Sequence, residues 1–234
     1  MCGITGELNF KKAVVAENIS KMVSAIAHRG PDDEGIFCNQ EIGLGHRRLA
    51  IIDLSPAGHQ PMWTSDKSLC IVFSGEVYNY REIRPELEAE GYNFKINSDT
   101  EVVLNAIHFW GIDKALQKFI GMFAFALWDA RERCLLLARD RAGIKPLFYA
   151  NTAESFLFAS ELKALYAHPC YVKRLNSRGL GQFFVLGYTL DDATVFSETY
   201  RVPAAHYLKV AGDRTISLKS YWDIDSIKRN SFVG

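Results

Sequence analysis

The feature that most constrains the fold is a pair of strand-like segments within residues 123–140, separated by a polar turn at 130–133. In the first segment Phe123, Phe125 and Leu127 recur at every second position, which places them on one face of a strand and predicts core packing. Two strands joined by so short a polar turn pair with each other antiparallel. The chain is therefore expected to build at least one antiparallel sheet.

Other segments repeat this strand signal, and helices fall between them in blocks. Strand-like stretches occur at 35–38, 41–52, 69–73, 147–150, 155–159 and 205–210. Helical spacing of apolar residues predicts helices at 16–27, 80–90, 99–110, 161–167 and 177–186. Ser98 can cap the third of these helices, and the apolar run 183–186 predicts that the last one is buried. Because helices do not alternate strictly with strands, the class is α+β rather than a doubly wound parallel sheet.

Composition excludes several classes of function. The 234 residues hold 27 basic and 27 acidic side chains, so no net field favours nucleic acid or an anionic membrane as partner. No apolar run approaches the roughly 18 residues of a membrane span. The first residues lack a secretory signal, which predicts a cytoplasmic protein with reduced thiols. We expect one domain over residues 1–210 and a tail, 211–234, that leads toward a missing downstream domain.

Cys2 has an unusual position in the sequence. It is followed by Gly3, and Met1 is removed when the next side chain is small, so the mature chain is expected to begin with a cysteine. One residue then carries a thiol, with an ordinary pKa near ~8.5, and an α-amine near ~8 that can accept the thiol proton. Cys38, Cys70, Cys134 and Cys170 lie in or near apolar stretches and are expected to be buried. Neither the cysteines nor the six histidines show metal-ligand spacing.

Several motifs accompany Cys2 in a fixed order along nearly the whole chain. They are Cys2-Gly3-Ile4-Thr5-Gly6, His28-Arg29-Gly30-Pro31-Asp32, Gly45-His46-Arg47-Arg48-Leu49-Ala50-Ile51-Ile52-Asp53, Gly75-Glu76-Val77-Tyr78-Asn79, Ser98-Asp99-Thr100-Glu101 and Arg139-Asp140-Arg141-Ala142-Gly143-Ile144-Lys145-Pro146-Leu147. Together they resemble the class II glutamine amidotransferases, and within them the N-terminal glutaminase domain of glutamine-hydrolysing asparagine synthetases.

The resemblance implies a fold and a reaction. The fold is the four-layer αββα N-terminal-nucleophile fold, in which two antiparallel sheets pack face to face under outer helices. In the reaction, the Cys2 thiolate attacks the side-chain amide of glutamine, ammonia leaves, and water resolves the γ-glutamyl thioester to glutamate. The α-amine of Cys2 acts as the base.

The resemblance also implies roles for three charged residues. Arg48 matches the position that binds the α-carboxylate of glutamine, for which a planar guanidinium is suited, and it is preferred to its neighbour Arg47 on this match alone. Asp99 and Glu76 match the positions that receive the α-ammonium. A helix-capping role for Asp99 is an alternative that does not exclude this one.

The oxyanion hole is where the sequence departs from the family. The usual Asn-Gly-Glu is Ser74-Gly75-Glu76 here. The Gly75 N–H remains available as a donor, whereas the Ser74 hydroxyl is shorter than an amide side chain, and losing one oxyanion donor can cost ~2.7 to 4 kcal/mol. We expect an active enzyme with a lowered rate, which Ser74→Asn should raise.

Partners and cofactors follow from the same resemblance. Glutamine is the substrate, and no cofactor or metal is expected in this chain. ATP and Mg are expected only in a downstream synthetase domain that adenylates aspartate, and a homodimer is left open. The basic residues Arg139, Arg141 and Lys145 lack a Gly-rich phosphate loop, so a structural or interdomain role is expected for them. Two alternatives are an amidotransferase for another acceptor, such as a sugar or an antibiotic precursor, and a weakly active glutamine-binding module.

Overall fold

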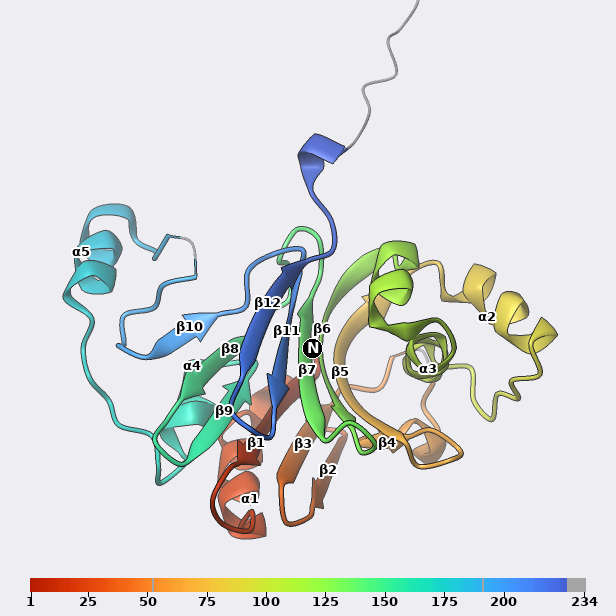
Figure 1. Cartoon of the computed structure of the whole chain (residues 1–234), viewed down its shortest axis with the longest axis horizontal. Coiled ribbons are helices and arrows are strands. Elements are labelled where there is room, and N and C mark those ends of the chain that lie inside the picture. The colour runs from red at the N-terminus through yellow and green to blue at the C-terminus, as the bar shows by residue number, and fades with distance from the viewer. Residues whose placement is uncertain (52, 191, 227–234) are drawn as a thin grey trace, which may run out of the picture.

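The computed structural model describes residues 1–51, 53–190 and 192–226, which form two six-stranded antiparallel sheets (Figure 1). The strands of the first sheet are β1 (Gly3–Asn9), β2 (Asp33–Cys38), β3 (Ile42–Arg48), β8 (Phe148–Asn151), β9 (Ser155–Ala159) and β10 (Thr199–Arg201). Those of the second are β4 (Met62–Trp63), β5 (Leu69–Val77), β6 (Gly121–Asp129), β7 (Cys134–Arg139), β11 (His206–Ala211) and β12 (Ile216–Ser220). Their spatial orders are β10-β8-β9-β1-β3-β2 and β12-β11-β7-β6-β5-β4.

The helices of the described residues are α1 (Ala16–Ala25), α2 (Tyr80–Ala89), α3 (Asp99–Lys118), α4 (Leu162–Tyr166) and α5 (Ser177–Leu186). All but α5 cover the outer faces of the sheets. Short 3₁₀ turns lie at η1 (Ala27–Arg29), η2 (Pro56–Gly58) and η3 (Ile224–Ser226). The apolar faces of α1 and α4 pack on the first sheet, and those of α2 and α3 pack on the second. The four-layer αββα arrangement expected from the sequence is confirmed.

The hairpin of β6 and β7 forms as predicted and is buried on both faces. Phe123, Phe125 and Leu127 point toward the layer of α2 and α3, whereas Ala124 and Ala126 point into the core between the sheets. The alternation therefore identified one real core face. The small alanines on the other face let the two sheets approach closely.

Strand β1 was not predicted, although it carries Cys2 at its start. It lies in the middle of the first sheet, paired with β3 and β9, and is buried on both sides. The segment alternates apolar Ile4 and Leu8 with polar Thr5 and Glu7, but two of its seven residues are glycines, which lower the strand propensity. Gly6 is required here, because a Cβ at that position would lie 2.3 Å from the carbonyl oxygen of Gly43.

Other expected elements have different bounds, and the strand expected over 69–73, which is β5, runs to Val77. The strand expected over 41–52 ends at Arg48, residues 49–51 leave the sheet, and residue 52 lies outside the described residues. The helix expected over 99–110 continues to Lys118, with a kink at Gly111, whose φ of 75° is accessible to glycine. β12 pairs with β11 within the segment assigned to the tail, and the domain boundary at 210 stays a prediction.

The expectation that the apolar run of α5 is buried is wrong. The helix has the predicted bounds and is capped by the Asn176 side chain, but Phe184 and Val185 are each 81% exposed. Phe183 and Leu186 are also exposed. The reason is placement, because α5 stands beside the sheets rather than over either of them (Figure 1). Periodicity identifies an apolar helix but not what covers it.

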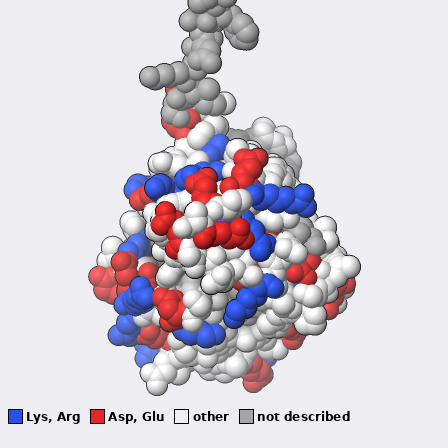
Figure 2. Space-filling view, turned by 90° about the vertical axis from the view of Figure 1, so that its right-hand side faces the viewer, with Lys and Arg blue, Asp and Glu red and all other residues white. Residues whose placement is uncertain are grey.

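Charges are mixed on the surface that carries α2 and α3. Figure 2 shows Lys and Arg side chains interspersed with Asp and Glu over this face. The equal numbers of basic and acidic residues in the chain are thus accompanied by a mixture of both charges on this face. Within the described segments, none of the helices has the length and apolar character needed to cross a membrane.

Candidate active site

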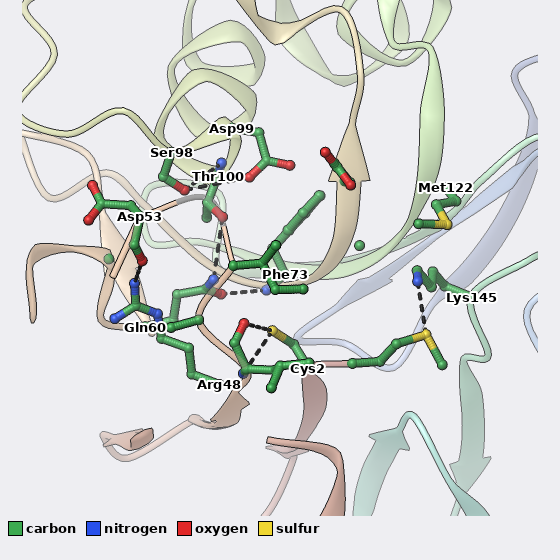
Figure 3. A pocket seen from close by; sticks show the side chains of 17 residues that line it. Cys2, Arg48, Asp53, Gln60, Phe73, Ser98, Asp99, Thr100, Met122 and Lys145 are labelled. Atoms are coloured by element: carbon green, nitrogen blue, oxygen red, sulfur yellow. Dashed lines mark hydrogen bonds between the residues drawn. The ribbon is translucent and has the colours of Figure 1, made fainter. Parts of the chain in front are cut away.

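A pocket lies where the ends of the two sheets meet, and the residues singled out by the sequence converge on it (Figure 3). The first sheet contributes Cys2, just before β1, and Arg48 at the end of β3. The second sheet contributes Gly75 and Glu76 from β5, and Asp99 enters from the first turn of α3. Segments far apart in the sequence therefore build one site.

Cys2 is held by backbone groups on both sides. Its sulfur accepts a hydrogen bond from the Leu49 N–H (3.4 Å) and can donate to the Leu49 carbonyl oxygen (3.6 Å). Its own carbonyl oxygen accepts from Arg29 Nε at 3.0 Å and from Ser74 Oγ at 2.7 Å. The thiol is half-buried and faces the pocket. The Leu49 N–H is thus placed to donate to the sulfur, and the two side-chain donors fix the backbone of Cys2.

The other described thiols are poor nucleophiles by comparison. Burial raises the pKa of the Cys38 and Cys134 thiols to about 11 and raises that of Cys70 further. Cys70 and Cys134 are buried as expected, whereas Cys38 and Cys170 are only half-buried. Burial also raises the pKa of the Cys170 thiol, and a raised pKa favours the protonated, less nucleophilic form of all four side chains.

The Ser74 hydroxyl makes a different contact from the one that an oxyanion donor would make. It is buried and donates to the Cys2 carbonyl, and it is not among the residues that line the pocket. Gly75 does line the pocket and has a φ of 151°, and a Cβ there would lie 2.2 Å from the Met122 carbonyl oxygen. Only glycine fits this position. The oxyanion roles of Ser74 and Gly75 stay predictions.

Arg48 is fixed by the loop that follows its strand. Nη1 donates to the Ser55 carbonyl at 2.8 Å and Nη2 donates to the Asp53 carbonyl, while Gly58 lies against the guanidinium. Each terminal nitrogen carries two N–H groups, so one on each nitrogen remains for a carboxylate. Arg47 points elsewhere and forms an ion pair with Glu34. The geometry thus agrees with the preference for Arg48.

Asp99 is a buried carboxylate, 4% exposed, in the wall of the pocket. One of its oxygens accepts from the Val77 N–H at 3.0 Å, while the helix is capped by Ser98, which accepts from the Thr100 N–H. Burial raises the pKa of Asp99 to about 6, and the negative charge of the neighbouring Glu76 adds to this. A bound cation would relieve both effects.

Sequence reasoning missed two polar residues of the pocket. Gln60 accepts from the Phe73 N–H at 2.7 Å and so anchors the loop before β4 to β5. Lys145 lines the pocket although it is only 4% exposed. The sequence predicts a structural or interdomain role for the motif that contains Lys145. That role suits Arg139, whose guanidinium binds the carbonyl oxygens of Lys145 and Val202. The sequence alone does not indicate that the Lys145 side chain enters the pocket whereas the Arg139 side chain binds backbone carbonyls.

The ionisable side chains of the pocket define its chemistry. Across residues 1–51, 53–190 and 192–226, no group of three or more His, Cys, Asp or Glu side chains is placed to hold a metal ion. The pocket offers one cysteine, one arginine, one lysine and three carboxylates, which are those of Asp53, Glu76 and Asp99. This charge pattern complements a free amino acid with a reactive side chain.

Comparison with known proteins identifies the family of the chain. A sequence profile described as "Glutamine amidotransferase domain" matches residues 1–222. The chain is 39% identical to asparagine synthetase [glutamine-hydrolyzing] 3 of Bacillus subtilis (strain 168), over 97% of this chain and 38% of that protein. It is 37% identical to a putative asparagine synthetase [glutamine-hydrolyzing] 2 of Methanocaldococcus jannaschii, over 97% of this chain and 48% of that protein.

The fold has a solved counterpart. Glutamine phosphoribosylpyrophosphate amidotransferase from B. subtilis superposes with a TM-score of 0.70 at 20% identity, over 94% of this chain and 49% of that one. At this identity the likeness establishes the fold alone. The chain spans less than half the length of the two synthetases. The match over residues 1–222 shows that the chain belongs to the glutamine amidotransferase domain family.

Proposed function

We propose that the chain hydrolyses the side-chain amide of glutamine to glutamate and ammonia, as the ammonia-supplying part of a glutamine-hydrolysing asparagine synthetase. The observation that carries the proposal is the convergence of Cys2, Arg48 and Asp99 on one pocket from three separate elements. The names of the relatives support asparagine as the product of the whole protein.

Glutamine binding follows from the opposite charges of Arg48 and of the pair Glu76 and Asp99, all of which line the pocket. Its α-carboxylate accepts the remaining N–H groups of Arg48, and its α-ammonium lies between Glu76 and Asp99. The side-chain amide then extends toward Cys2. Since Arg48 and Asp99 are both fixed by backbone partners, little reorganisation is needed when glutamine binds.

The reaction begins once Met1 has been removed. The Cys2 α-amine takes the thiol proton, and sulfur attacks the amide carbon to form a tetrahedral oxyanion, toward which the Gly75 N–H donates. The C–N bond breaks, the amine returns its proton to the leaving nitrogen, and ammonia departs. Water then hydrolyses the thioester, which gives glutamate and the free thiol. ATP and Mg serve only the later activation of aspartate, in the remainder of the synthetase.

The test is glutamate release by the purified chain whose N-terminus has been checked by mass spectrometry. Cys2→Ala should abolish release, by at least about a thousandfold. Cys170→Ala, a matched change at another partly exposed cysteine, should leave release unchanged. Turnover by Cys2→Ala, or by a chain that retains Met1, would overturn the mechanism, and bound but unhydrolysed glutamine would indicate a binding module.

A further inference from the structure

Lys145 is a nearly buried cation whose ammonium contacts the residue expected to be removed. Its Nζ lies 2.9 Å from Met1 Sδ (Figure 3), and within the described chain it has no other hydrogen-bond or ion-pair partner. A thioether sulfur is a weak acceptor, and a buried charge without a good partner is unfavourable. When Met1 leaves, Lys145 loses even this contact.

The loop that carries Lys145 is fixed independently of Met1. The buried Asp140 carboxylate accepts hydrogen bonds from the backbone N–H groups of Ala142, Ile144 and Lys145, at 2.9 to 3.1 Å. Arg139 Nε donates to the Lys145 carbonyl at 2.7 Å. Removal of one terminal residue therefore leaves the backbone of Lys145 in place.

The direction of Lys145 is equally informative. Met1 Sδ is joined to the Cys2 nitrogen through four methionine carbons, and Met1, Cys2 and Lys145 all line the same pocket. The same ammonium interacts electrostatically with Cys2 itself. After processing, the Cys2 α-amine and the Lys145 ammonium therefore share this pocket.

Charged groups from four segments surround this ammonium. Burial and Arg29, from η1, lower the pKa of Lys145, while Asp140 after β7, Cys2 before β1 and Glu76 in β5 oppose that shift. Arg29 is paired with Glu161. An α-amine has an ordinary pKa about two units below that of a lysine, so the amine is the first of the two to lose its proton.

We propose that in the processed chain Lys145 faces the Cys2 α-amine and keeps that amine neutral, and so able to accept a proton, at neutral pH. The proposal rests on the proposed role of the amine as base. Two ammonium groups in a shielded pocket repel each other, so the lysine charge favours the neutral form of its neighbour. Lys145 acts through the amine and is a positioning residue.

The experiment measures the charge state of the amine without glutamine turnover. In a processed Cys2→Ala chain, brief acetylation at a series of pH values labels only unprotonated amines. Mass spectrometry of the N-terminal peptide then gives the midpoint, which is the pH at which half of the α-amine is unprotonated. Adding Lys145→Met should raise this midpoint by about one pH unit. Lys145→Arg keeps the charge and should leave it unchanged, as should Lys209→Gln, a surface lysine that pairs with Glu132.

Kinetics of the chain with Cys2 intact provide the second measurement. Lys145→Met should lower kcat/KM about fivefold at pH 7. Near pH 9 kcat/KM should return to the wild-type value, because the acid limb of its pH dependence moves to higher pH. An unchanged acetylation midpoint, or a loss of activity in both Lys145→Met and Lys145→Arg that no pH restores, would overturn the proposal. If Cys2→Ala still released glutamate while the midpoint moved, the proposed function would fail and the inference about the amine would stand.

Discussion

The two ends of the pocket satisfy their charges differently. At the end that is proposed to recognise the amino acid, Arg48 is held by loop carbonyls and Asp99 by a backbone N–H, so fixed groups of both charges are present. At the reacting end, Lys145 has only a methionine sulfur as partner. The first end is prepared for a zwitterion, whereas the second carries an excess positive charge beside the nucleophile.

This difference separates binding from chemistry. Changes at the recognition end should act on KM or kcat/KM through lost contacts with the substrate, while changes at the reacting end should act on kcat and on its pH dependence. Substitutions at three positions test this division.

Asp99→Asn should have the largest effect, because it removes the buried counter-charge for the α-ammonium. We expect kcat/KM for glutamine to fall about 100-fold. Thermal stability at pH 7 should be kept or rise. The folded-state pKa of Asp99 is about 6 against an ordinary 3.8, so folding binds a proton between these values, and stability decreases as pH rises through this window.

The pH dependence of glutamine binding provides a check on Asp99. In the wild type KM should rise as pH falls below about 6, since the protonated carboxyl no longer attracts the ammonium. Asp99→Asn should remove this dependence, and Asp113→Asn, on a surface carboxylate paired with Lys219, should not. Parallel losses of activity and melting temperature in Asp99→Asn would assign the residue a structural role instead.

Ser74 tests the reacting end, with a smaller effect. Ser74→Ala removes one of two donors to the Cys2 carbonyl, so kcat should fall about fivefold while KM stays within twofold. Ser74→Asn supplies the missing amide donor and should raise kcat above that of the wild type. Steady-state glutamate release measures both. Turnover in Ser74→Asn that is equal to or below that of the wild type would contradict the oxyanion role.

Gly58→Ala should have the smallest effect, because it alters the recognition end only indirectly. The added Cβ would lie 2.3 Å from Nη2 of Arg48 and would displace the guanidinium. We expect KM to rise about threefold with kcat unchanged. Gly181→Ala is the matched control, since a Cβ in α5 meets nothing within 4 Å and should stabilise the helix by roughly 0.5–1 kcal/mol. A change in kcat but not in KM would show that the two ends are coupled.

The fold was predictable where side chains of different size alternate or where a cap is marked locally. The β6–β7 hairpin, although buried on both faces, follows from its alternation of large and small side chains, and the Ser98 cap of α3 follows from local hydrogen-bond chemistry. Strand β1 was missed because two of its seven residues are glycines, and α5 was misjudged because its apolar face is not covered. Sequence periodicity reports the polarity of an element, and its surroundings are set by tertiary contacts.

The site was predictable for residues that match motifs and not for the contacts that position them. Cys2, Arg48, Gly75, Glu76 and Asp99 all line the pocket. The groups that hold them are largely backbone atoms, such as the Leu49 N–H and the Ser55 carbonyl. Every residue type carries these backbone groups, so the sequence does not indicate which of them make the contacts. Lys145 was missed because its direction depends on a loop organised by Asp140.

The exposed aromatic face of α5 has a practical consequence for work with this chain. Phe184 and Val185 are almost fully solvated, and contiguous exposed apolar side chains promote self-association at high protein concentration. None of the α5 residues lines the pocket. Polar replacements at these two positions should therefore give a more soluble sample for titration and spectroscopy, with the kinetics of the site unaltered.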